Sequence, residues 1–180
     1  SVDKAYLWLE QAYFVYQHEE WRELKTRAED IIKVYGSAQP YVQPEGIRFV
    51  LSSAYNLLAI AVQRLDTTKS RSDKSPQDYW KQAENLLQGL ATSEAKRLLQ
   101  DVRINFAVYW LDKGDCDIAV EKLEALYHQC IVSAQDAIDA LPAQRQMLIK
   151  HNLAAAYLHR PGYLDRANGL VQENLVSARE

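Results

Sequence analysis

The sequence predicts an all-α fold, and three observations support that prediction. Apolar residues recur at three- and four-residue spacing along most of the 180-residue chain, as they do on one face of a helix. No stretch alternates apolar and polar residues convincingly over several strand lengths. Six glycines and five prolines are few for this length. A chain of this size is also long enough to bury one continuous core.

Breaks in the periodic pattern divide the chain into about eight helices, which pair as four hairpins. Gly36 ends the second periodic segment, and Gly114 with Asp115 separates two later ones. Pro142 provides a start signal near the C-terminal end. The expected helices span residues 2–17, 20–35, 45–65, 77–90, 93–113, 116 to about 130 and beyond, 142–159 and 164–178.

Two connections between these helices have a distinct composition. The prolines in residues 37–44, SAQPYVQP, enforce an extended connection. Residues 67–75, TTKSRSDKS, contain no apolar side chain that could anchor them. We therefore expect the second connection to be a mobile loop whose shortening leaves the fold intact.

Three stretches repeat one order of residues. Each has an Asn, two apolar residues, a turn, a small Ala on the next helix and two further apolar residues. The asparagines are Asn56, Asn105 and Asn152. A fourth, N-terminal copy keeps the apolar spacing but has Glu10 in place of the Asn. The residues of the second helices are Ala83, Leu87 and Leu90, then Ala119, Leu123 and Leu126, then Ala167, Val171 and Leu175.

The small residues explain how such a hairpin could pack. Alanine at a helix crossing lets two backbones approach closely, and we expect this at Ala107 with Ala119 and at Ala154 with Ala167. Larger apolar residues then fill the space toward the neighbouring hairpin. A lone hairpin cannot bury both apolar faces, so stacking creates the core.

This pattern resembles the tetratricopeptide repeat (TPR) family over nearly the whole chain. The resemblance rests on the Asn step, the aromatic residue five positions later at Trp110 and Tyr157, the glycine-containing turn and the Ala of the second helix. It implies a right-handed stack of about four antiparallel hairpins, a TPR-like α-solenoid, forming a single domain over 1–180. The asparagines lie 49 and 47 residues apart, whereas the family unit is about 34, so longer helices and linkers are implied.

The resemblance also implies that the first helix of each hairpin lines a concave inner face that binds peptides or partner helices. Each Asn precedes a core-facing apolar residue, which turns the amide about 100° away from the core. An amide can hydrogen-bond the backbone of a ligand whatever its side chains are. The predicted partner-binding residues are Asn56, Asn105, Asn152, Tyr55, Ile104, Val108, His151, Ala155 and His159.

Tyrosine and tryptophan are numerous, and three tyrosines gather on the first helix. Tyr6, Tyr13 and Tyr16 take neighbouring positions on its surface. They form either an aromatic binding edge or half-buried packing, in which they seal the end of the stack or pack against the second helix. We favour packing, because an apolar ring with a polar tip suits a half-buried position.

Charge and hydropathy exclude other classes of protein. With 21 Lys and Arg against 24 Asp and Glu, the net charge of −3 gives no field that attracts nucleic acid. The longest apolar run, residues 57–62, is far shorter than the ~20 residues that span a bilayer. We expect no membrane span and a cytoplasmic protein. The chain opens on Ser1 rather than Met, which suggests a piece excised from a longer protein.

Residues capable of metal binding or catalysis lack the required spacing. His128 and Cys130 are two apart and do not face each other on a helix, so we expect no metal. No phosphate loop, nucleophile elbow or paired carboxylate motif is present, so we expect no cofactor and no enzyme. Cys116 and Cys130 lie fourteen residues apart, roughly 21 Å along one helix, too far for a disulfide. They fit small apolar side chains in a reducing compartment.

Two functional hypotheses follow. The favoured one is a scaffold or adaptor that binds a peptide or helix of a partner protein in its concave groove. The alternative is a regulatory or oligomerisation segment of a larger signalling, transcriptional or enzymatic protein, whose groove is filled by the same polypeptide or a second copy. A helical RNA-reading array is a weaker option, because the charge balance is slightly acidic.

Overall fold

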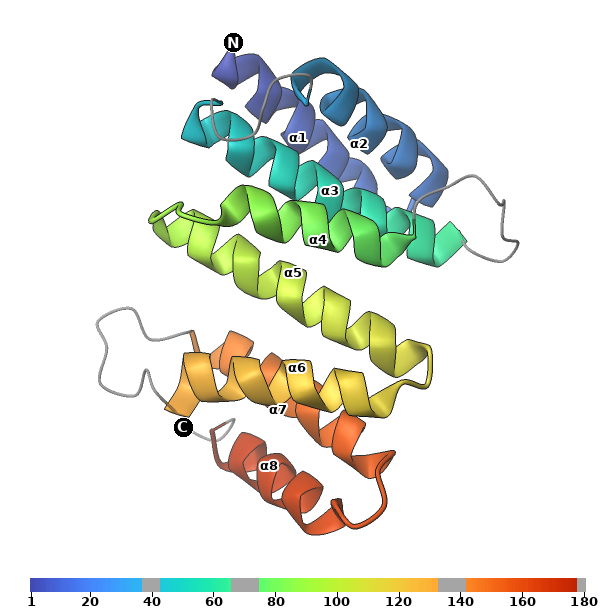
Figure 1. The fold of residues 1–180 in the computed structure, drawn as a ribbon, viewed down its shortest axis with the longest axis vertical. Coiled ribbons are helices and arrows are strands. Elements are labelled where there is room, and N and C mark those ends of the chain that lie inside the picture. The colour runs from blue at the N-terminus through green and yellow to red at the C-terminus, as the bar shows by residue number, and fades with distance from the viewer. Residues whose placement is uncertain (37–42, 66–74, 133–141, 178–180) are drawn as a thin grey trace. The chain divides into compact units, whose positions relative to one another are not determined.

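The computed structural model describes residues 1–36, 43–65, 75–132 and 142–177, and this part of the chain is helical and free of strands (Figure 1). The predicted all-α class is therefore confirmed. A short π-helical segment, η2, continues α6. The elements are α1 (Val2–Gln17), α2 (Trp21–Tyr35), α3 (Glu45–Leu65), α4 (Pro76–Leu87), α5 (Ser93–Asp112), α6 (Cys116–Tyr127), η2 (His128–Val132), α7 (Ala143–Leu158) and α8 (Leu164–Ser177).

Most helix boundaries agree with the sequence signals to within one or two residues. Helix α4 ends three residues earlier than predicted, because Gly89 takes a left-handed conformation with φ of 79°. Two features fix its start: Pro76 occupies the first turn, and the Ser75 amide donates to Asp78 Oδ2 at 3.1 Å. The predicted loop 67–75 lies almost entirely outside the described residues, as does most of connection 37–44.

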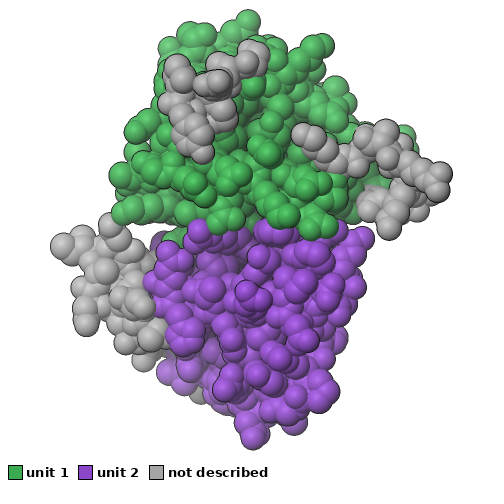
Figure 2. All heavy atoms as spheres, viewed as in Figure 1, with its two compact units in different colours: residues 1–102 green, residues 103–180 purple. Residues whose placement is uncertain are grey.

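The chain divides into two compact units, residues 1–102 and residues 103–180 (Figure 2). The division falls within α5. Each unit has its own hydrophobic core. The expected single domain over 1–180 stays a prediction.

Helix α3 is the centre of unit 1. It packs against α1, α2 and α4, and apolar side chains of all four helices form one core. Polar side chains also join α3 to α4: the Ser52 hydroxyl donates to the Ala83 carbonyl at 2.8 Å, with Ser52 fully buried. By length and composition α3 could cross a membrane, but most of its apolar window is buried inside the unit, as in the core helix of a soluble fold.

In unit 2, α7 packs against α6 and α8. The four alanines predicted to lie at helix crossings, Ala107, Ala119, Ala154 and Ala167, are all buried in this core. Their burial agrees with the prediction, and their pairing at helix crossings stays a prediction. Val171 and Leu175 hold the same repeat positions as Leu123 and Leu126, but they are 43% and 50% exposed. The reason is that α8 packs chiefly against α7, which leaves the other side of α8 uncovered in the described structure.

The tyrosines of α1 are packed in part, because Tyr6 and Tyr13 remain 39% and 36% exposed. Tyr16 meets Trp21 of α2 edge to face at 6.0 Å, and Tyr6 stacks on Phe49 of α3 at 6.1 Å between ring centroids. Burial raises the pKa of Tyr13. Tyr16 therefore packs against the second helix, as the favoured alternative expects, whereas Tyr6 and Tyr13 stay partly open to solvent.

The two cysteines are both free thiols, as predicted, and Cys130 is buried in the core of unit 2.

Candidate partner-binding surfaces

Asn56 does not face an open groove. It is only 5% exposed, and its Oδ1 accepts a hydrogen bond of 3.0 Å from the indole Nε1 of Trp80, which is fully buried in α4. The predicted outward orientation was therefore wrong for this Asn. Helix α4 covers that side of α3, and the buried indole N–H needs an acceptor there.

Tyr55 also faces α4. Its ring stacks on Tyr79 at 6.3 Å between centroids, and burial raises the pKa of Tyr55. The two partner-binding residues predicted in unit 1 therefore belong to the contact between α3 and α4. Neither is brought to an exposed surface.

The residues predicted on α5 of unit 2 are divided between core and surface. Ile104 is 4% exposed and belongs to the hydrophobic core, so its assignment to a groove was wrong. Val108 is half-buried and packs against the same core. Asn105, between them, is half-buried.

Helix α7 matches the prediction best. His151 and His159 are exposed, and Ala155 is half-buried between them. These residues recur at four-residue spacing, so they share one side of the helix. Leu148 and Leu158 extend the same side and are 45% and 59% exposed. The third copy of the repeat thus places its predicted residues together on a solvent-facing stripe. Asn152, next to His151, is half-buried.

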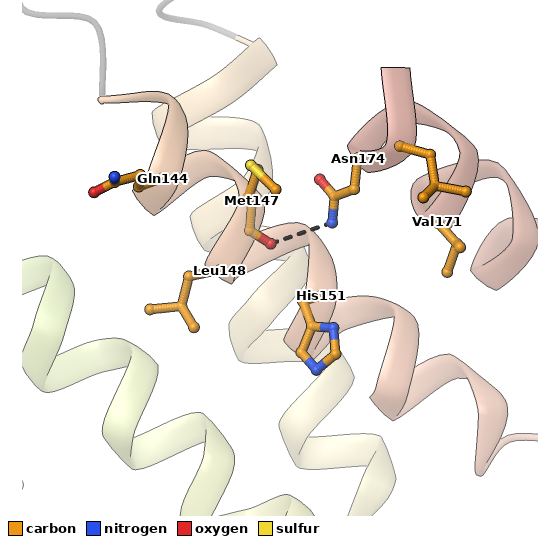
Figure 3. Close-up of a pocket in the computed structure, with 7 residues that line it drawn as sticks. Gln144, Met147, Leu148, His151, Val171 and Asn174 are labelled. Atoms are coloured by element: carbon orange, nitrogen blue, oxygen red, sulfur yellow. Dashed lines mark hydrogen bonds between the residues drawn. The ribbon is translucent and has the colours of Figure 1, made fainter. Parts of the chain in front are cut away.

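A hollow of about 480 Å³ runs beside this stripe, between α7 and α8 (Figure 3). Leu148 and His151 project from α7, and Val171 projects from α8 on the opposite side. The lining is mostly apolar and remains open to solvent. The lining residues are Gln144, Met147, Leu148, His151, Val171, Asn174 and Leu175.

Polar contacts hold α7 and α8 together around the hollow. The Asn174 amide donates from Nδ2 to the Met147 carbonyl at 3.3 Å (Figure 3). Its Oδ1 is buried and has no hydrogen-bond partner in the described structure. One residue earlier, Glu173 pairs with Lys150 at 2.9 Å, and Lys150 is only 9% exposed. These links fix the spacing of the two helices, so the hollow is a preformed feature.

Nothing in the described residues forms a metal site: no group of three or more His, Cys, Asp or Glu is placed to hold an ion there.

The sequence reasoning missed Leu148, Val171 and Leu175 as surface residues. A signal for them was available in α8, which carries two apolar stripes. One stripe, with Ala167 and Leu170, is buried against α7. The other stripe, with Leu164, Val171 and Leu175 at seven- and four-residue spacing, is exposed. A helix with apolar residues on two sides needs a second covering surface.

Comparison with known proteins adds nothing to these surfaces: no protein-family model matches the chain, and no curated protein and no solved structure matches it.

Proposed function

We propose that this chain is a protein-binding scaffold or adaptor domain, which takes a peptide or helix of a partner protein in the hollow between α7 and α8. The observation that carries the proposal is the exposed apolar lining formed by Leu148, Val171 and Leu175. Apolar patches of this kind on soluble proteins mark interaction sites.

The shape of the hollow suits an amphipathic helix. Such a ligand buries apolar residues spaced three, four and seven apart in a groove between two helices. Leu148, Val171 and Leu175 would contact that apolar face. Gln144 and His151, at the rim, offer hydrogen-bonding groups that would orient the ligand.

The wider architecture belongs to the same proposal. We take the helices to be antiparallel hairpins of a right-handed TPR-like stack, in which α7 is the first helix of the last hairpin. The buried crossing alanines of unit 2 support this arrangement. The solvent-facing stripe of α7 would then be the part of the inner face that binds the partner.

The test is site-specific photo-crosslinking with a photoreactive amino acid at position 148. The control places the same group at Leu7, which is 53% exposed on α1. We expect a protein from the source cells to be crosslinked at position 148 and not at position 7, and the crosslinked peptide defines the ligand. Equal crosslinking at the two positions would show that the hollow is not the site.

The second stage measures affinity for the identified peptide. Leu148→Glu should weaken binding at least about 10-fold, equal to roughly 1.4 kcal/mol, because it places a charge in the apolar lining. Leu7→Glu should leave the affinity unchanged. Sedimentation of the chain alone distinguishes partner binding from self-association. If the chain forms a dimer and Leu148→Glu dissociates it, the hollow binds a second copy, and the partner proposal is overturned.

The same affinity measurement tests the predicted Asn side chains. Replacing Asn105 and Asn152 together by Ala should weaken binding by about 0.5 to 1.5 kcal/mol for each hydrogen bond lost to the ligand. Unchanged affinity would remove these two residues from the site while leaving the apolar hollow in place.

A further inference from the structure

Unit 1 contains a separate cavity of about 260 Å³, formed where α1, the start of α3 and the start of α5 meet. Cavities that hold whole cofactors or drug-sized ligands are about 300 to 1,000 Å³, so this one suits a single side chain. Figure 1 shows the first turn of α3 and the turn that joins α4 to α5 at the same end of unit 1. The lining residues are Tyr6, Glu45, Gly46, Phe49, Leu90, Thr92 and Glu94.

Two aromatic rings form one wall. Tyr6 and Phe49 stack with 6.1 Å between centroids and 25° between planes, and Tyr6 remains 39% exposed. Aromatic faces carry negative electrostatic potential and attract ammonium groups within about 6 Å of the ring centroid. Hydrocarbon next to an ammonium group can pack on the same rings.

Two carboxylates complete the lining. Glu45 lies in the first turn of α3 and Glu94 in the first turn of α5. A helix N-terminus favours a carboxylate in each position, which accounts for each residue alone. It does not account for their meeting at one aromatic cavity. Neither forms an ion pair or hydrogen bond with any described residue.

The cationic side chains nearby are engaged elsewhere. Arg48, three residues after Glu45, donates from Nε to the Leu86 carbonyl at 3.1 Å and also to the Gln88 carbonyl. Lys4 lies over the Trp8 ring at 5.6 Å from its centroid. Among the described residues, the cavity therefore combines two carboxylates that lack an ion pair with two aromatic faces.

Gly46 keeps this cavity open. A Cβ at this position would lie 2.9 Å from Val2 Cγ1 and 3.6 Å from Tyr6 Cε2, so a side chain would push into the space beside the Tyr6 ring. Glycine within a helix costs up to about 1 kcal/mol relative to alanine. The close approach of α1 gives a physical reason for its presence in α3.

We propose that this cavity binds the ammonium group of a lysine side chain, primary or methylated, presented by another protein. The aliphatic part of the lysine packs on Tyr6 and Phe49, and the ammonium group is neutralised by Glu45 and Glu94. This site lies in unit 1 and does not depend on the hollow between α7 and α8.

The experiment is an amide-resolved NMR titration of the full chain with three small probes. The probes are the N-acetyl, N-methylamide derivatives of lysine, of trimethyl-lysine and of norleucine, which has a neutral side chain. We expect both lysine probes to shift the amides of Tyr6, Gly46, Phe49 and Thr92, and norleucine to leave them unshifted. Equal shifts with norleucine would overturn the proposal.

Matched variants test whether Glu45 and Glu94 neutralise the ammonium group. Replacing Glu45 and Glu94 together by Gln should weaken lysine binding at least about fivefold, whereas Glu10→Gln, an exposed carboxylate on α1 outside the cavity, should not. A separate variant, Phe49→Leu, should weaken trimethyl-lysine binding while amide dispersion shows a retained fold. If Glu10→Gln weakened lysine binding as much as the double replacement of Glu45 and Glu94, the binding would reflect the charge of the whole surface. That result would overturn the proposed site.

The outcome is independent of the proposed function. Leu148→Glu should leave the lysine titration unchanged, and the Gln pair should leave the affinity for the crosslinked peptide unchanged.

Discussion

Helices α3 and α7 both carry the Asn and the two apolar residues of the repeated pattern, yet the two helices have different surroundings. In unit 1, α3 packs against three helices, and its Asn56 is 5% exposed. In unit 2, α7 packs against two helices, and its Asn152 is half-buried. Leu148 and His151 therefore remain at the surface of α7. The number of covering helices, rather than the position in the repeat, therefore decides whether a residue is core or binding surface.

The largest expected effect concerns the helix that covers α3. Trp80→Ala should destabilise the fold by about 3 to 5 kcal/mol, because the indole is fully buried and its removal leaves a cavity between α3 and α4. Urea denaturation measures the change. Trp21→Ala, at a half-buried ring, is the matched control and should cost less. Equal losses would mean that α4 does not cover α3 as tightly as its contacts indicate.

A smaller effect separates the two asparagines directly. Asn56→Ala leaves the buried Trp80 indole N–H without its acceptor and should cost about 1 to 3 kcal/mol of stability. The same change at Asn152 should cost within about 0.5 kcal/mol, since surface substitutions usually have effects of that size. Denaturation midpoints of the two variants give the comparison. Similar losses would show that both copies use the Asn in the core.

Within unit 2, two alanines distinguish the packed and open sides. Ala119 is fully buried in the core of unit 2, so Ala119→Leu should overpack its surroundings and cost about 1 to 3 kcal/mol. Ala155 lies on the solvent-facing stripe of α7, and Ala155→Leu should leave the stability nearly unchanged. An unchanged midpoint for the Ala119 variant would contradict the close helix approach.

The smallest expected effect concerns the polar link of unit 2. The Tyr157 hydroxyl donates to Glu124 Oε1 at 2.6 Å, and burial, together with Glu124, raises the pKa of Tyr157 to about 12. The fold therefore favours the protonated phenol. Its contribution is present below the unfolded value of 10.0 and is lost as the pH rises from there to about 12.

Tyr157→Phe tests this link through the pH dependence of unfolding. The variant should lose about 0.5 to 1.5 kcal/mol near neutral pH and should show a shallower decline in stability at alkaline pH. Tyr163→Phe, which keeps a ring that packs on Tyr157 at 5.1 Å, is the control. A parallel decline in the Tyr157 variant and the parent would mean that another group causes the alkaline loss.

Helix positions were predictable because their signals are local. Gly114, whose φ is 82°, marks the stop after α5, and Pro142 marks the start of α7, each through backbone geometry that the residue itself imposes. The burial of the four alanines was predictable for a similar reason, because small residues permit close approach of two backbones. The end of α4 was missed, since the apolar Leu90 continued the periodic pattern beyond the turn at Gly89.

The candidate site was predictable only in part. His151, Ala155 and His159 do share one side of the helix, because helical periodicity alone puts them together, and their role in partner binding stays a prediction. Asn56 and Ile104 were misplaced, since their burial depends on which helix packs over them. Val171 and Leu175 continue the repeated pattern, yet they are exposed because α8 packs chiefly against α7. Periodicity identifies an apolar side of a helix but does not say whether another helix covers it.

Arg48 joins two helix ends whose opening is therefore coupled. The last carbonyls of α4 have no amide donors within their own helix, and the guanidinium of Arg48 serves as donor to two carbonyls at that end. Fraying of α4 consequently releases a charged group from the first turn of α3. Amide protons in these two turns should exchange with solvent in one event and with one free energy of opening, although 38 residues of sequence separate Arg48 from Leu86.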